Sequence, residues 1–87
     1  MKTYYSNYLT MNLGTNVKYE VYYVFSCETD SETNGQDWDL DRLRVKLLVN
    51  GSEIAVEEKD CDAELWEWLI EQAQGDHDEG NSHQTPF

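Results

Sequence analysis

The stretch LRVKLLVNGSEIAV, residues 43–56, decides the fold because it has the sequence of a β-hairpin. Apolar residues alternate with charged ones on both sides of Asn50 and Gly51, which is the period of strands with one buried face. An Asn-Gly pair favours a two-residue type I′ turn, since both residues tolerate positive φ. This turn predicts the cross-strand pairs on the two faces: Leu47 with Ile54, Val45 with Val56, and Arg44 with Glu57.

Two further strands are expected before this hairpin. The odd positions of residues 5–13 are mostly apolar, and residues 17–25 alternate more strongly and are rich in β-branched and aromatic side chains. Turn residues at 14–16 join the two segments into a second hairpin. Residues 28–41 then lose this periodicity and are expected to form a long acidic loop around Asn34-Gly35.

A helix is expected after the second hairpin, capped by Asp60 or Asp62 and ended by Gly75. Its apolar stripe consists of Leu65, Trp66, Leu69, Ile70 and Ala73. Residues 76–87 show no periodicity, so we expect a disordered acidic tail there. The sequence therefore predicts one α+β domain over residues 1–75. Its four-stranded antiparallel sheet (β-β-β-β-α) carries one C-terminal helix on one face.

The composition excludes several classes of function. The chain has 87 residues, with 6 Lys+Arg against 18 Asp+Glu and a formal net charge of -12, which disfavours direct binding to nucleic acid or to an anionic membrane. A domain of this size buries only about 60–65 % of its unfolded surface, so a deep enzyme cleft is not expected. The sequence contains neither a phosphate-binding loop nor a dinucleotide-binding glycine pattern, and no nucleophile with a readable base beside it. We therefore expect no catalysis and no cofactor.

The sequence also predicts a soluble, cytoplasmic protein. The first residues lack the apolar core of a signal peptide, and no apolar stretch approaches the about 20 residues that cross a bilayer. Cys27 and Cys61 lie far apart without C-x-x-C spacing, and we expect both to be structural thiols in a reducing compartment.

The acidity is concentrated in one region. Residues 1–27 are close to neutral, whereas residues 28–87 carry a net charge of about -13. On a helix, carboxylates three and four residues apart lie about 5–6 Å apart between Cβ atoms, a spacing close to that of nucleic-acid phosphates. The candidate partner-binding residues are Glu57, Glu58, Asp60, Glu64, Glu67, Trp68, Glu71, Asp37, Trp38 and Asp39.

In size, acidity and small α+β plan, the chain resembles the phage-encoded inhibitors that mimic DNA, such as uracil-DNA glycosylase inhibitor and several anti-CRISPR proteins. This resemblance implies a non-catalytic, stoichiometric inhibitor, of the anti-CRISPR or anti-restriction kind, working in the host cytoplasm. Its partner would be a host defence or DNA-handling protein, whose basic nucleic-acid-binding groove the carboxylates occupy.

Two other interpretations stay open. Acidic surfaces commonly serve solubility alone, although a charge of -12 exceeds the about 2 to 8 that a small domain needs. If the helix covers only one face of the sheet, Tyr4, Tyr8 and Tyr22 form an exposed aromatic patch on the other. Such a patch suits an accessory interaction module or a homodimer contact, with the acidity serving solubility.

Two metal-binding patterns are incomplete. The segment from Asp30 to Asp41 approximates a twelve-residue calcium loop, but it has Glu at position 3, Asp at position 12 and Asp37 in place of a hydrophobic residue. His77 and His83 lie among carboxylates in the expected tail, which favours adventitious binding over a built site. We therefore predict no dedicated metal site.

Overall fold

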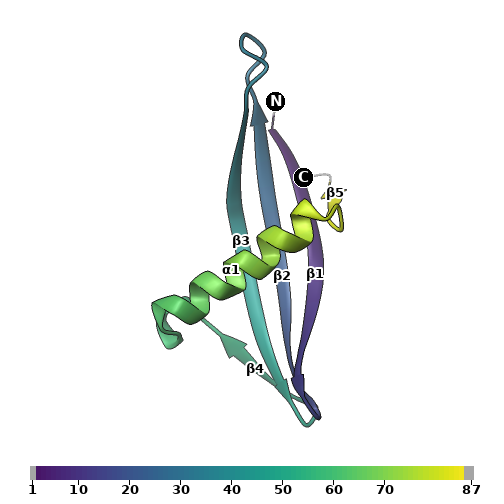
Figure 1. The fold of residues 1–87 in the computed structure, drawn as a ribbon, viewed down its shortest axis with the longest axis vertical. Helices are drawn as coiled ribbons and strands as arrows, with labels where there is room; N and C mark the ends of the chain where they lie inside the picture. Colours follow the sequence, from purple (N-terminus) through teal and green to yellow (C-terminus); the bar gives the residue numbers. More distant parts are fainter. Residues whose placement is uncertain (1, 86–87) are drawn as a thin grey trace.

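A computed structural model describes residues 2–85 of the chain. Five strands form one antiparallel sheet in the order β4-β3-β2-β1-β5, and a single helix crosses one of its faces (Figure 1). The elements are β1 (Lys2–Gly14), β2 (Val17–Thr29), β3 (Gln36–Val49), β4 (Ser52–Val56), the short 3-10 helix η1 (Glu58–Asp60), α1 (Ala63–Asp78) and β5 (His83–Thr85). The predicted α+β class, antiparallel sheet and single C-terminal helix are confirmed. The predicted number of four strands is wrong, because β5 adds a fifth.

The β3–β4 hairpin has the predicted turn and register. Asn50 and Gly51 have φ angles of 50° and 86°, as a type I′ turn requires. Leu47 pairs with Ile54 and Val45 pairs with Val56. The predicted contact of Arg44 with Glu57 is not formed, because β4 ends at Val56. The ion pairs nearby are instead Lys46–Glu53 at 3.6 Å and Lys59–Glu57 at 3.0 Å.

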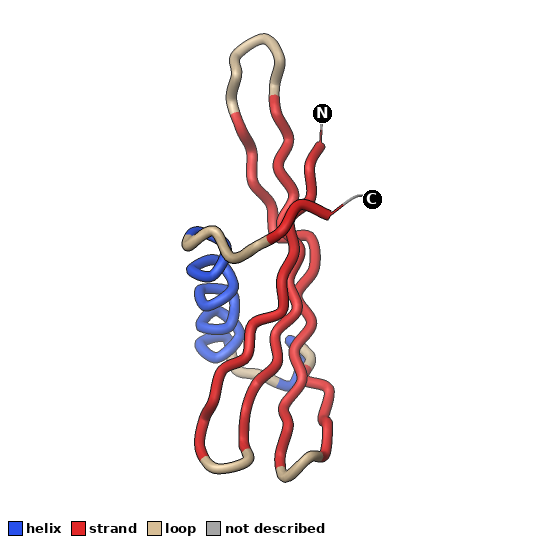
Figure 2. The backbone as a smooth tube through the Cα atoms, turned by 90° about the vertical axis from the view of Figure 1, so that its right-hand side faces the viewer, coloured by secondary structure: helices blue, strands red, loops and turns tan. Residues whose placement is uncertain are grey.

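The predicted acidic loop at 28–41 is wrong over most of its length. β2 runs on to Thr29 and β3 begins at Gln36, so only a short turn remains, closed by a 3.0 Å hydrogen bond from the Asp30 amide to the Gly35 carbonyl. Asp41 is an extra residue in β3, because Val24 pairs with residue 42 whereas residue 25 pairs with residue 40. Because of this bulge, the inward apolar residues of β3 are even-numbered before Asp41 and odd-numbered after it. The two-residue period is interrupted there, so the strand is not evident from the sequence. The resulting hairpin extends well beyond the helix (Figure 2) and makes the molecule elongated, with extents of 51 × 24 × 21 Å.

The core lies between α1 and the middle of the sheet. Val21, Val45 and Leu69 form one buried cluster, and Tyr23, Phe25 and Ala73 form a second. Asp62 caps the helix, as one of the two predicted alternatives, and its carboxylate accepts a 2.7 Å hydrogen bond from the Leu65 amide. Cys27 is buried and Cys61 is partly buried, and both are free thiols. No helix within residues 2–85 has the length and apolar character needed to cross a bilayer.

Residues 76–85 have a defined structure, which corrects two predictions. The helix continues through Gly75 to Asp78, and β5 pairs with residues 4–6 of β1, so the expected disorder of residues 76–85 is wrong. The part of that prediction on residues 86–87 lies outside the described residues. Glycine in a helix costs about 1 kcal/mol, but Asp76 and His77 directly after it contact β1 and β2 and offset this cost. Gly80, with a φ of 83°, follows the helix end instead.

Candidate partner-binding surface

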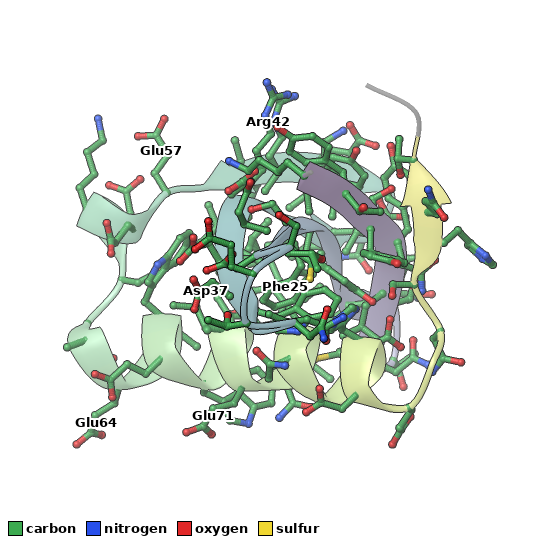
Figure 3. The ribbon with its side chains drawn as sticks, turned by 90° about the horizontal axis from the view of Figure 1, so that it is seen from above. Phe25, Asp37, Arg42, Glu57, Glu64 and Glu71 are labelled. Carbon is green, nitrogen blue, oxygen red and sulfur yellow. The ribbon has the colours of Figure 1, made fainter. Side chains whose placement is uncertain are left out.

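The outward side of α1 carries a row of carboxylates. Glu64, Glu67 and Glu71 are exposed and project opposite the buried stripe of Leu69 and Ala73, because helical residues three and four apart share a face. Figure 3 shows Glu64 and Glu71 pointing away from the sheet. The rise of a helix places these two residues about 10 Å apart along the axis. Within residues 2–85 none of the three has an ion-pair partner, so their charges face solvent without compensation.

Trp68 lies within this row of carboxylates. It is four residues after Glu64 and three before Glu71, and its side chain is 37 % exposed. Glu58 of η1 adjoins the same side of the molecule, since Glu58 and Glu67 line one open hollow. We call Glu58, Glu64, Glu67, Trp68 and Glu71 the acidic helix surface. In protein interfaces, exposed aromatic side chains commonly act as central anchors and charged side chains surround them. Trp68 and the carboxylates around it have this arrangement.

The remaining candidate residues lie elsewhere. Glu57 points away from Glu64 and Glu71 (Figure 3) and its carboxylate is paired with Lys59, while Asp60 is exposed in η1. Asp37, Trp38 and Asp39 belong to β3 and not to a loop. Of the ten predicted residues, five therefore form the acidic helix surface, three lie on β3, and Glu57 and Asp60 belong to neither group.

Trp38 is part of a cluster of rings at the C-terminal end of α1. Its ring centroid is 4.8 Å from that of His77 and 5.5 Å from that of Tyr5, and His77 also stacks on Phe25 at 4.8 Å. This packing gives Trp38 a structural role, although 44 % of its side chain remains exposed. Sequence reasoning missed His77 because its ring partners come from three different strands.

A partly buried hydrogen-bond network lies beside this cluster. The Asp76 carboxylate accepts hydrogen bonds from the Tyr23 hydroxyl at 2.6 Å, the Asn7 amide at 2.9 Å and the Asn81 amide at 3.1 Å. Burial acts to raise the pKa of Asp76, but the hydrogen bonds from Tyr23, Asn7 and Asn81 outweigh it, so the pKa lies below its usual value. Burial, followed by the hydrogen bond and charge of Asp76, raises the pKa of Tyr23. Every group in this network has a partner, so it fastens the helix to the sheet.

The face of the sheet opposite the helix has a different character. The rings of Tyr8 and Tyr22 lie tilted against each other there, with centroids 4.7 Å apart, beside three basic side chains of β3. Arg42 points away from the helix (Figure 3). An open groove of about 330 Å³ is lined by Tyr8, Glu20, Tyr22, Arg42, Arg44 and Lys46. The sequence signal for this basic face was the alternation of Arg42, Arg44 and Lys46, which places all three on one side of a strand.

The incomplete calcium loop is not assembled. Asp30 uses its carboxylate to accept from the Glu32 amide, and Asp41 lies on β3, where it accepts from the Ser26 hydroxyl at 2.9 Å. His77 uses Nδ1 in a 2.7 Å hydrogen bond with the Ser82 hydroxyl. Across residues 2–85, no three His, Cys, Asp or Glu side chains are grouped so as to hold a metal ion.

Comparison of the chain with protein-family models, with curated proteins and with solved structures finds no match.

Proposed function

We propose that the protein is a non-catalytic inhibitor whose acidic helix surface occupies the basic, nucleic-acid-binding site of another protein. The observation that carries this proposal is the row formed by Glu64, Glu67 and Glu71, exposed and without ion-pair partners within residues 2–85, with Trp68 in its middle. A rigid helix presents these charges in a fixed geometry, so a partner need not order them on binding.

The negative charges of the chain repel one another, which gives an energetic reason for a basic partner. A net charge of -12 on 87 residues repels itself in the compact state, and every carboxylate except those of Glu20 and Asp76 is exposed. A partner groove lined with Lys and Arg relieves this repulsion and releases counterions, as it does when it binds phosphates. Complementary potentials also accelerate association.

The position of the basic residues supports the same surface. Arg42, Arg44 and Lys46 lie on the opposite face of the sheet, so they do not neutralise the helix face. The carboxylates of the helix row have no salt bridge within the described chain. The acidic helix surface and the three basic side chains of β3 therefore lie on opposite sides of the sheet, the basic ones together with Glu20 and Glu53.

Affinity capture tests this proposal. The tagged protein is incubated with bacterial lysate at low and at high salt, with and without competing duplex DNA, and the retained proteins are identified by mass spectrometry. We expect retention of a DNA- or RNA-handling protein that is lost at high salt and displaced by DNA. Retention of a partner indifferent to both would reject the proposal and favour an accessory interaction module that uses the Tyr8–Tyr22 face.

A further inference from the structure

The groove on the helix-free face of the sheet is built from three adjacent strands in register. Tyr8 of β1 pairs with Tyr22 of β2, which pairs with Arg44 of β3. In the neighbouring cross-strand pairs of β2 and β3 on this face, the β3 residues are Arg42 and Lys46. Neighbouring strands are about 4.8 Å apart, so a ligand that spans from Tyr8 to Arg44 covers about 10 Å. This groove is independent of the acidic helix surface, which lies across the sheet.

The two arginines are unusual for so acidic a chain. Both are exposed, and within residues 2–85 neither guanidinium has a carboxylate within ion-pair distance, although the chain has 18 acidic residues. Lys46 is partly neutralised by Glu53 at 3.6 Å. Arg42 and Arg44 are two residues apart on one strand, about 6.6 Å, and each presents a planar fork of donors that fits the oxygens of a phosphate.

Tyr8 supplies a flat apolar platform beside these charges. Its side chain is 73 % exposed, the highest value among the large apolar side chains in the described part of the protein. The ring of Tyr22, inclined by 33° to that of Tyr8, supports it from one side. The outer face of the Tyr8 ring is therefore held in place and open, as in proteins that stack a nucleobase on an aromatic side chain.

We propose that this groove binds a nucleoside phosphate unit, with the base stacked on Tyr8 and the phosphate held by Arg42 and Arg44. The groove volume of about 330 Å³ lies in the range of small-ligand sites. Glu20 lines the same groove and can accept a hydrogen bond from a base amine or a ribose hydroxyl. An acidic peptide would use the arginines and leave Tyr8 unexplained. Duplex DNA would also leave Tyr8 unexplained, because its bases are paired and stacked on one another and are not free to stack on an exposed ring.

Isothermal titration calorimetry at low salt tests the proposal with three probes: AMP, a short single-stranded oligoadenylate and inorganic phosphate. We expect AMP to bind at least about tenfold more tightly than phosphate, because stacking adds to the phosphate contacts. Tighter binding of the oligoadenylate, with a steeper salt dependence, assigns the natural ligand to a single strand. Equal binding per nucleotide assigns it to a free nucleotide. Either result supports the site.

Matched variants separate this site from a general charge effect. Arg44→Ala and Tyr8→Leu should each weaken AMP binding about tenfold or more, whereas Tyr8→Phe, which keeps the ring, and Lys59→Ala, which removes a charge elsewhere, should not. The three side chains changed are exposed, so all four variants should fold, and unchanged thermal unfolding confirms this. Absence of binding by both AMP and oligoadenylate at about 1 mM overturns the proposal. Equal binding of phosphate and AMP, or binding of oligoglutamate in place of AMP, also overturns it.

Discussion

The phenol of Tyr23 joins the middle of the sheet to the C-terminal part of the helix. Its ring is completely buried in the second core cluster, and its hydroxyl donates to the Asp76 carboxylate. A hydrogen bond to a charged group contributes more to stability than one between neutral groups. This single contact helps to explain why the helix does not end at Gly75.

Replacement of Tyr23 by Phe should lower the free energy of unfolding by about 1.5–3 kcal/mol at neutral pH, measured by urea denaturation. The change removes the donor and keeps the ring. Tyr22→Phe is the matched control, because no hydrogen bond of its hydroxyl is formed within residues 2–85. An equal effect of the two substitutions would show that the Asp76 contact contributes nothing.

The pH dependence of stability should report the same contact. The pKa of Asp76 is lower in the folded state than its usual value, so its contribution to stability is complete above about pH 4 and is lost as the pH falls through the lowered folded pKa. Asp76→Asn lacks this contribution. We expect the difference in unfolding free energy between wild type and variant to shrink on acidification from pH 6 to about pH 2. A difference independent of pH would contradict the assignment.

The hairpins and the helix illustrate how far the sequence alone predicts the fold. The β3–β4 hairpin and the Asp62 cap depend on residues a few positions apart, so local patterns were sufficient to find them. The bulge at Asp41 and the strand β5 depend on partners distant in sequence. The polar segment His83–Thr85 has no apolar period of its own, and it is ordered by pairing with the edge of β1 and by the hydroxyl contact of Ser6 with Thr85 at 2.5 Å.

The candidate site was predictable to a similar extent. The spacing of Glu64, Glu67 and Glu71 in the sequence predicts that they share one face, because this depends only on the helix period. The location of Trp38 was not predictable, because the bulge and the ring of His77 fix it. Nor did local patterns reveal the groove beside Tyr8, which requires the register of three strands.

Asp62 at the start of α1 allows the contribution of the helix cap to stability to be measured. Asp62→Ala should destabilise the protein by about 1 kcal/mol in urea denaturation, because the Leu65 amide loses its acceptor. Asp60→Ala removes the same charge from η1, where its carboxylate caps nothing, and should change stability by less than about 0.5 kcal/mol. Equal losses would indicate that net charge, rather than capping, accounts for the effect.

Amide hydrogen exchange tests the order of the C-terminal segment. Amides that the β1–β5 pairing holds in hydrogen bonds should exchange more slowly than those of the turn at residues 31–34. Deletion of residues 83–87 should then remove protection from the outer edge of β1 while the β2–β3 pairing is retained. Equally fast exchange in β5 and in the turn would mean that β5 is not formed.

The molecule as a whole carries its acidic helix surface and its basic side chains on opposite faces of one sheet. Glu64, Glu67, Trp68 and Glu71 lie on the helix side. Arg42, Arg44 and the tilted Tyr8–Tyr22 pair lie on the opposite side, together with Glu20. The β2–β3 hairpin carries further exposed acidic residues, among them Glu32, Asp37 and Asp39. Two triple variants with the same change in net charge therefore distinguish a specific acidic surface from overall acidity.

The most direct test is the salt dependence of the affinity for the nucleic-acid-handling partner retained in the capture experiment. It is measured for wild type, for E64K/E67K/E71K and for E32K/D37K/D39K. We predict that the helix variant loses at least about tenfold in affinity and has a flatter salt dependence, because fewer ion pairs form with the partner. The hairpin variant should stay close to wild type in both. Equal losses in the two variants, or unchanged binding by the helix variant, would contradict the account.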